Sequence, residues 1–289
     1  MNYIKLLLLF VLCWCLQFTS ARAETINNNS SLHNLLQSGI AQIEQGDLEQ
    51  AQHTLTEIID RHPELSHVST NYNLYDKRSN EIVNSIQLAY LHRGLAAYRL
   101  GKYQLALADF DVAQKIYPWQ VEPYYNMGLA WSGQREYEEA IAQYNLALTQ
   151  VSSQDETKIA DIYNDRGLAY LNLHNFAAAI SDFNLGLRYQ GNNSWLYYNR
   201  GCACHRYGDY AQAINSFSQA LAVNPNQSEA YINRGLIHYH LGHIEIAFAD
   251  LNAGAKSFYS QGKMVDFEKV MELIKQMHSK ISDLPSLAV

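Results

Sequence analysis

The sequence predicts an all-α protein in which one pair of helices is repeated along the chain. Aromatic, glycine and alanine residues recur in the same order, mostly at intervals of 34 residues. Every copy holds two apolar patterns of helical period, and glycine or proline ends several of them. Because one helix pair cannot bury its apolar face alone, we expect the copies to stack around a continuous core.

Five copies share one register, with an aromatic residue at position 4, glycine at position 8 and alanine at position 20. These residues are Tyr90, Tyr124, Tyr163, Tyr197 and Tyr231; Gly94, Gly128, Gly167, Gly201 and Gly235; and Ala106, Ala140, Ala179, Ala213 and Ala247. A weaker copy precedes them, with Leu35, Gly39 and Ala51 at the same positions. The glycines and alanines lie where two helices must approach closely.

This pattern resembles the tetratricopeptide repeat (TPR), as the fifth copy shows with Tyr197-Tyr198-Asn199-Arg200-Gly201 and Ala213-Ile214-Asn215-Ser216-Phe217. The copy is similar to variants common in bacteria. The resemblance implies a right-handed α-solenoid of six TPR helix-turn-helix repeats with a C-terminal capping helix. The expected repeats span residues 32–65, 87–120, 121–154, 160–193, 194–227 and 228–261.

Single residues mark the ends of several helices. In the fifth repeat, Gly208 is expected to end the first helix in a left-handed cap, and Pro225 to stop the second. Asp155 suits the start of a lengthened first helix in the fourth repeat. Residues 66–86 are expected to be an insertion or linker. Its second half continues the next apolar pattern, so that helix is expected to begin near Ser79 or Asn80.

The two ends of the repeat array are expected to differ from its middle. Residues 24–31 are rich in Asn and Ser and are expected to be disordered. Residues 262–281 are expected to form the capping helix, and 282–289 a loose tail. The apolar face of the capping helix would consist of Phe267, Val270, Ile274 and Met277.

Arginine recurs at position 7 of four repeats, and a polar residue follows sixteen positions later. The pairs are Arg93 with Asp109, Arg166 with Asp182, Arg200 with Ser216, and Arg234 with Asp250. Where position 7 is not arginine, as at Met127 and Ser38, position 23 carries no charge either. We therefore predict ion pairs within repeats, between the two helices of each, and not a basic binding stripe.

Residues 1–23 are expected to be a signal peptide for export. An apolar run follows Lys5, and Ala21 and Ala23 supply the small residues that a signal peptidase reads, so the mature chain would begin at Glu24. The run is short for a membrane span. An uncleaved anchor is the alternative. The predicted compartment is the periplasm or another extracytoplasmic space, such as a thylakoid lumen, or the exterior of the cell.

Composition and motifs argue against several function classes. The formal net charge is −7, and no basic cluster is present, which disfavours nucleic acid as a partner. The sequence has no Gly-rich phosphate loop, nucleophile elbow or zinc-protease helix motif. We therefore expect a protein that is not an enzyme and has no cofactor.

One group of residues carries possible metal or redox chemistry. Cys202 and Cys204 are followed by His205, and His238, His240 and His243 stand one repeat later. The spacing matches no familiar closed zinc site. Cys204 and His238 also occupy a position that is normally buried in this repeat, so ordinary packing is the alternative.

The resemblance implies that the first helices line a concave face that binds polypeptides. Asn can both donate and accept hydrogen bonds, so a ladder of Asn at position 6, interrupted by Asp165, could hold an extended peptide backbone. Alternatively, Asn is simply common at this position, and the aromatic residues around it pack between neighbouring helices. The candidate peptide-binding residues are Asn126, Asn199, Asn233, Asp165, Tyr125, Trp195, Tyr198, His205 and Tyr239.

Three functions remain open at this stage. The first is a scaffold that assists assembly or recruitment of a protein complex by binding another protein or an extended peptide segment. The second is an adaptor for an envelope enzyme, such as a cell-wall hydrolase or protease. The third is a metal or redox role at Cys202, Cys204 and the histidines.

Overall fold

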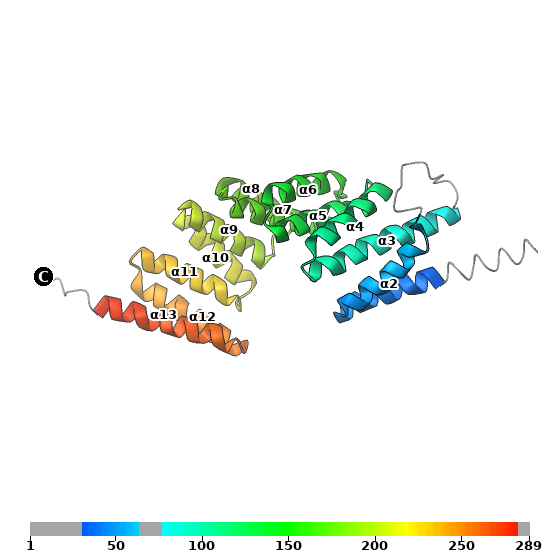
Figure 1. The fold of residues 1–289 in the computed structure, drawn as a ribbon. Helices are drawn as coiled ribbons and strands as arrows, with labels where there is room; N and C mark the ends of the chain where they lie inside the picture. Colours follow the sequence, from blue (N-terminus) through cyan, green and yellow to red (C-terminus); the bar gives the residue numbers. More distant parts are fainter. Residues whose placement is uncertain (1–30, 64–76, 283–289) are drawn as a thin grey trace, which may run out of the picture. The chain divides into compact units, whose positions relative to one another are not determined.

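The computed structural model describes residues 31–63 and 77–282, and every regular element in these ranges is a helix. The chain forms two compact units, which meet in sequence between Glu136 and Tyr137. Within each unit, consecutive helices pack side by side in an antiparallel arrangement (Figure 1). The predicted all-α class of stacked helix pairs is therefore confirmed. The proposed signal peptide, residues 24–30 and residues 64–76 lie outside the described ranges.

The first unit begins with a helix over residues 31–45. Four further helices follow: α2 (Leu48–Asp60), α3 (Lys77–Arg99), α4 (Tyr103–Ile116) and α5 (Val121–Gln134). Each of α2, α3 and α4 packs against the next of these helices. The helix α3 begins two residues before Ser79, so its backward extension into the insertion was predicted correctly and its start was placed slightly late.

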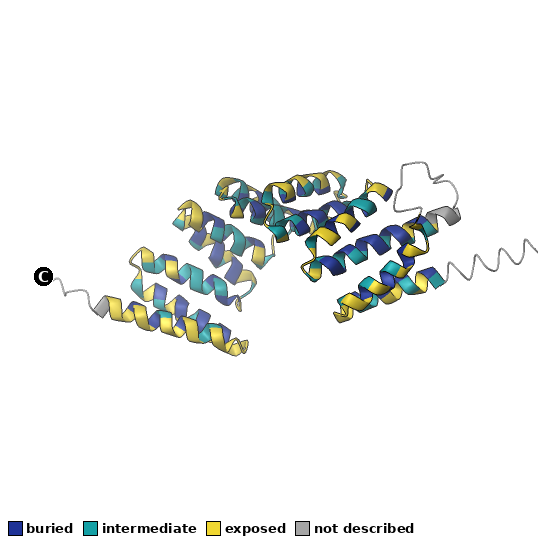
Figure 2. Ribbon diagram, in the orientation of Figure 1, coloured by how far each residue is buried: buried dark blue, intermediate teal, exposed yellow. Residues whose placement is uncertain are grey.

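Residues 137–282 of the second unit form eight helices. They are α6 (Tyr137–Gln150), α7 (Glu156–Asn172), α8 (Phe176–Tyr189), α9 (Ser194–Tyr207), α10 (Tyr210–Val223), α11 (Ser228–His240), α12 (Ile244–Ser260) and α13 (Met264–Ser282). The strongest contacts join α7 to α8, α9 to α10, and α11 to α12, and each pair then packs on its neighbour. Figure 2 shows buried residues on the facing sides of these helices and exposed residues on their outer sides.

The ends of these helices follow the predicted local chemistry. Asp155 precedes α7, and its Oδ1 accepts a hydrogen bond from the Lys158 N–H at 3.0 Å. Gly208 ends α9 with a φ of 92°, a left-handed conformation that glycine adopts without strain. At the C-terminal end, α13 buries Val270, Ile274 and Met277 against α12, which covers the last helix pair as a capping helix would.

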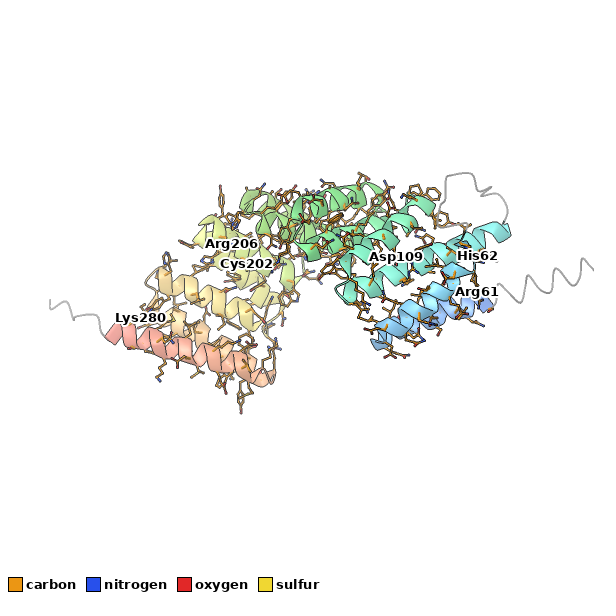
Figure 3. The ribbon with its side chains drawn as sticks, in the orientation of Figure 1. Arg61, His62, Asp109, Cys202, Arg206 and Lys280 are labelled. Carbon is orange, nitrogen blue, oxygen red and sulfur yellow. The ribbon has the colours of Figure 1, made fainter. Side chains whose placement is uncertain are left out.

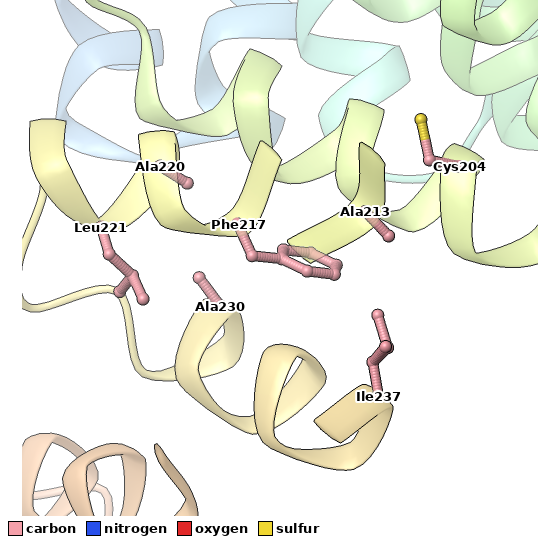
Figure 4. Packing of buried hydrophobic residues seen from close by; sticks show 7 residues of the cluster. All are labelled: Cys204, Ala213, Phe217, Ala220, Leu221, Ala230 and Ile237. Carbon is pink, nitrogen blue, oxygen red and sulfur yellow. The ribbon is translucent and has the colours of Figure 1, made fainter. Parts of the chain in front are cut away.

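The core between α9, α10 and α11 shows why small and aromatic residues alternate in the repeat. Phe217 of α10 is fully buried among Ala213, Ala230 and Ile237 (Figure 4). Its ring lies against Gly201 of α9 so closely that a Cβ there would be 2.7 Å from Phe217 Cε1. Because the glycine at position 8 has no side chain, the aromatic ring at position 24 can fill the space beside it.

The arginines at position 7 form the predicted pairs within repeats. Arg166 donates to both carboxylate oxygens of Asp182, at 2.8 Å from Nε and 2.6 Å from Nη2. Arg93 with Asp109 and Arg234 with Asp250 repeat this two-pronged geometry at 2.7–2.9 Å. The fourth arginine, Arg200, donates to Ser216 Oγ at 3.0 Å.

A third contact of each arginine was not predicted. Nη1 of Arg234 donates to Ser218 Oγ in the preceding repeat at 2.9 Å, and Nη1 of Arg93 donates to Thr56 Oγ1 at 3.0 Å. Arg166 and Arg200 make the same contact with an Asn side-chain oxygen at the equivalent position. Each guanidinium also lies 5.2–5.7 Å from the centre of the Tyr ring three residues earlier. One arginine therefore links three helices.

Replacing Gly201 with alanine tests the close helix approach. Because the new Cβ would overlap the buried Phe217 ring, Gly201→Ala is expected to lower the free energy of unfolding by about 1–3 kcal/mol, as measured by urea denaturation. Gly191→Ala is the matched control in the same unit, since its Cβ would meet only Leu187 O at 3.5 Å. This control should change stability by about 0.5 kcal/mol or less. Equal effects of the two substitutions would contradict the packing described here.

Candidate functional site

The candidate binding residues of the second unit lie on α7, α9 and α11, each of which is the first helix of its pair. The helix α9 contacts both of the others. On α9, Trp195, Asn199 and Cys202 recur at helical spacing and share one side. The Trp195 side chain is 54% exposed, and its ring meets the edge of Tyr198 at a centroid distance of 5.6 Å. The remaining residues of this side are partly buried, and we call the side formed by Asn164, Asp165, Trp195, Tyr198, Asn199, Cys202 and Asn233 the first-helix surface.

Asparagines of the first-helix surface connect neighbouring repeats. Asn199 Nδ2 donates to Asn164 Oδ1 at 2.8 Å, and Asn164 Nδ2 donates to Asp165 Oδ1 at 3.0 Å. One repeat later, Asn233 Nδ2 donates to the Tyr198 hydroxyl at 3.0 Å. In both cases position 6 of one repeat bonds to position 5 of the preceding repeat. The side-chain amides of Asn199 and Asn233 thus each donate at least one hydrogen bond to the preceding repeat.

The oxygens of the same asparagines remain available. Within the described residues, Oδ1 of Asn199 and Oδ1 of Asn233 accept no hydrogen bond, and both side chains are partly exposed. An amide oxygen can accept from the backbone N–H of an extended peptide. At these two positions, the asparagines would therefore serve a bound peptide mainly as hydrogen-bond acceptors.

Other predicted binding residues have different surroundings. Tyr239 packs against the cluster of α12 and α13, and His205 lies 5.8 Å from the ring of Tyr210 on α10. Burial and the charge of His240 lower the pKa of His205. Asn126 and Tyr125 belong to α5 of the first unit, where both are partly exposed. Tyr239 and His205 therefore lie apart from the asparagine contacts of the first-helix surface, and the binding role of all these residues stays a prediction.

The cysteines and histidines of the possible metal site are not brought together. Cys202 lies near Asn233, with Sγ 3.8 Å from Nδ2, whereas Cys204 is buried in the core around Phe217. Figure 3 shows Cys202 on α9 together with Arg206. His238 instead faces His243, with 3.3 Å between their Nδ1 atoms. Among the described residues, no three His, Cys, Asp or Glu side chains are grouped as metal ligands would be.

Comparison with known proteins agrees with the repeat pattern. Family models described as tetratricopeptide repeat match residues 33–64, 85–118, 160–193 and 194–227. The chain belongs to the tetratricopeptide-repeat family. No curated protein sequence matches this TPR protein. The TPR fold is typical of non-catalytic scaffolds for protein–protein interaction.

Solved TPR structures resemble this protein in fold at low sequence identity. PilW, described as a widely conserved type IV pilus biogenesis factor, has a TM-score of 0.65 and 16% identity, over 83% of this chain and 98% of PilW. The C-terminal part of a TPR repeat-containing protein from Cytophaga hutchinsonii has a TM-score of 0.63 and 19% identity, over 86% and 89%. YrrB, described as a TPR protein with an unusual peptide-binding site, has a TM-score of 0.51 and 16% identity, over 67% and 98%.

Within the described residues, no helix has both the length and the apolar character needed to cross a membrane.

Thiol labelling tests whether the cysteines take part in redox chemistry. Burial raises the pKa of both the Cys202 and the Cys204 thiols, which lowers the fraction of reactive thiolate near neutral pH. Reaction with Ellman's reagent at pH 7.5 is expected to be at least about tenfold slower in the folded protein than in guanidinium chloride. In a protein without Cys13 and Cys15, the variants Cys202→Ser and Cys204→Ser assign the labelling rate of each remaining thiol. Labelling of the folded protein at the unfolded rate would contradict the structural role.

Proposed function

We propose that this TPR protein is a non-enzymatic scaffold that binds an extended segment of another protein on the first-helix surface. The observation that carries the proposal is the exposed Trp195 ring, which is held by Tyr198 beside the free acceptor oxygens of Asn199 and Asn233. A large, rigid aromatic group supplies contact area at little entropic cost, and the amide oxygens would fix the peptide backbone.

The surroundings of this surface favour apolar or basic segments as ligands. Tyr198 and Trp195 provide the apolar area, and Asp165 carries negative charge on α7, whereas Glu229 on α11 is paired with Lys263 at 3.7 Å. The whole sequence has 28 acidic and 21 basic residues, so its long-range field also favours a basic partner. The description of YrrB as a peptide-binding TPR protein supports this use of the fold.

We further propose that the protein works in an extracytoplasmic compartment, where it assists the assembly or recruitment of a protein complex. The support for this compartment is the export signal expected in residues 1–23. PilW, a type IV pilus biogenesis factor by its description, is an example of this fold in an assembly role.

Selection of linear peptides tests the proposed surface. A displayed library of random peptides is expected to yield apolar or basic sequences that bind the wild-type protein. Trp195→Ala should weaken their binding at least about tenfold by isothermal titration calorimetry, because an aromatic anchor is lost. Trp119→Ala is the matched control, since Trp119 is also a tryptophan, is 56% exposed and lies between α4 and α5, outside the first-helix surface. Failure to select any binder, or unchanged binding by both Trp195→Ala and Asn199→Ala, would refute the proposal.

Processing of the amino terminus tests the proposed compartment. When the full-length protein is expressed in a bacterium with two membranes, mass spectrometry of the periplasmic fraction should show a protein that begins at Glu24. Ala21→Arg should block this cleavage, because signal peptidase requires a small residue there. A soluble cytoplasmic protein that retains Met1 would contradict export, and a membrane-bound protein that retains Met1 would favour an uncleaved anchor.

A further inference from the structure

A pocket of about 330 Å³ lies among α8, α9 and α10 of the second unit. Ile180 and Asn184 of α8 form one wall, and Arg200, Cys204 and Tyr207 of α9 form another. Arg200, Cys204 and Tyr207 recur at helical spacing, so they share the side of α9 that faces the second helices. The pocket is therefore separate from the first-helix surface.

Arg200 differs from the other three arginines at position 7 because it has no carboxylate partner among the described residues. Its Nε donates to Ser216 Oγ at 3.0 Å and its Nη1 to Asn184 Oδ1 at 2.9 Å, and both of these acceptors are neutral. Within the same ranges, Nη2 of Arg200 makes no hydrogen bond. In the other three repeats, Nη2 donates to an Asp Oδ1 at 2.6–2.7 Å.

An equivalent pocket in the first unit shows what is missing. It has a volume of about 500 Å³ and is lined by Arg93 and Thr56, which correspond to Arg200 and Asn184. There Nε and Nη2 of Arg93 donate to the two carboxylate oxygens of Asp109. A pocket beside the position-7 arginine is therefore present in both units, but around Arg200 the position of this Asp is taken by the fully buried Ser216.

The pocket around Arg200 also contains one acidic group. Asp209 lines it, but Asp209 Oδ1 accepts from the Gln212 N–H at 3.0 Å and caps α10. Asp209 forms no ion pair with Arg200 in the described part of the protein. A partly buried guanidinium with neutral partners has lost part of its hydration without gaining a counter-charge, and a carboxylate is the group that best matches its planar donors.

We propose that this pocket binds a carboxylate group of a partner polypeptide, which takes the place of the missing aspartate at Nη2 of Arg200. An acidic side chain and the free carboxyl terminus of a polypeptide present the same chemistry and are distinguished by experiment. Ile180 and Cys204 provide an apolar wall for the carbon atoms next to the carboxylate. The site does not depend on the proposed function of the first-helix surface, because it uses none of the same residues.

The test follows the Arg200 Nε–Hε signal by NMR at low salt, with the signal assigned by its loss in Arg200→Lys. The probes are N-acetyl-Ala-Glu-Ala-amide, which carries an acidic side chain, and N-acetyl-Ala-Ala, which has a free carboxyl terminus. The neutral N-acetyl-Ala-Gln-Ala-amide is the control peptide. At least one acidic probe is expected to shift the signal in a saturable manner, and the one that binds more tightly identifies the source of the carboxylate. The neutral peptide should not shift the signal.

Two variants supply an internal carboxylate and should compete with the probes. Ser216→Asp recreates the pair seen in three other repeats, and Asn184→Asp places a carboxylate on the exposed partner of Nη1. Each is expected to weaken probe binding at least about tenfold, whereas Ser216→Ala should retain it. Asn184→Asp remains informative if Ser216→Asp does not fold, since residue 184 lies at the surface. The proposal is overturned if neither acidic probe shifts Arg200, or if Asn184→Asp binds as tightly as wild type.

Discussion

The arginine at position 7 is the side chain that connects a helix pair to the preceding pair in four of the expected repeats. Arg166 and Arg234 each bind an aspartate on the second helix of their own repeat, and each also donates to the second helix of the preceding repeat. One planar group therefore sets the relative position of three helices. A buried ion pair adds little net stability over apolar packing, so its main contribution here is to fix geometry. The two described cysteines are free, so this geometry is held without a disulfide between them.

Contacts inside one repeat could be predicted from the sequence because their spacing is constant. The pairs Arg166–Asp182 and Gly201–Phe217 are each sixteen residues apart, and both are present in the structure. The left-handed cap at Gly208 depends only on local backbone geometry, so it could be predicted as well. The start of α3 was less certain because several polar residues near Ser79 can precede a helix equally well.

Contacts between repeats were harder to predict because their pairing depends on how neighbouring helix pairs are offset. Asn199 bonds to Asn164 and Asn233 bonds to Tyr198, and both pairs are 35 residues apart. This offset, one residue longer than the repeat, is visible in the sequence only once the stacking is known. The asparagines therefore looked like a free ladder for a ligand, although their N–H groups hold adjacent repeats together. The signal peptide and the repeat boundaries stay predictions.

Ser216 has a consequence for how the second unit loses its structure. In a linear array of repeats, total stability is approximately the sum of the stability of each repeat and of each junction between neighbours. Ser216 leaves the α9–α10 pair with a neutral hydrogen bond where the α7–α8 and α11–α12 pairs have ion pairs. Local opening is drawn from the least stable parts of a protein. Because Ser216 leaves the partly buried charge of Arg200 without a counter-charge, we expect local opening of the second unit to be easiest at the α9–α10 pair.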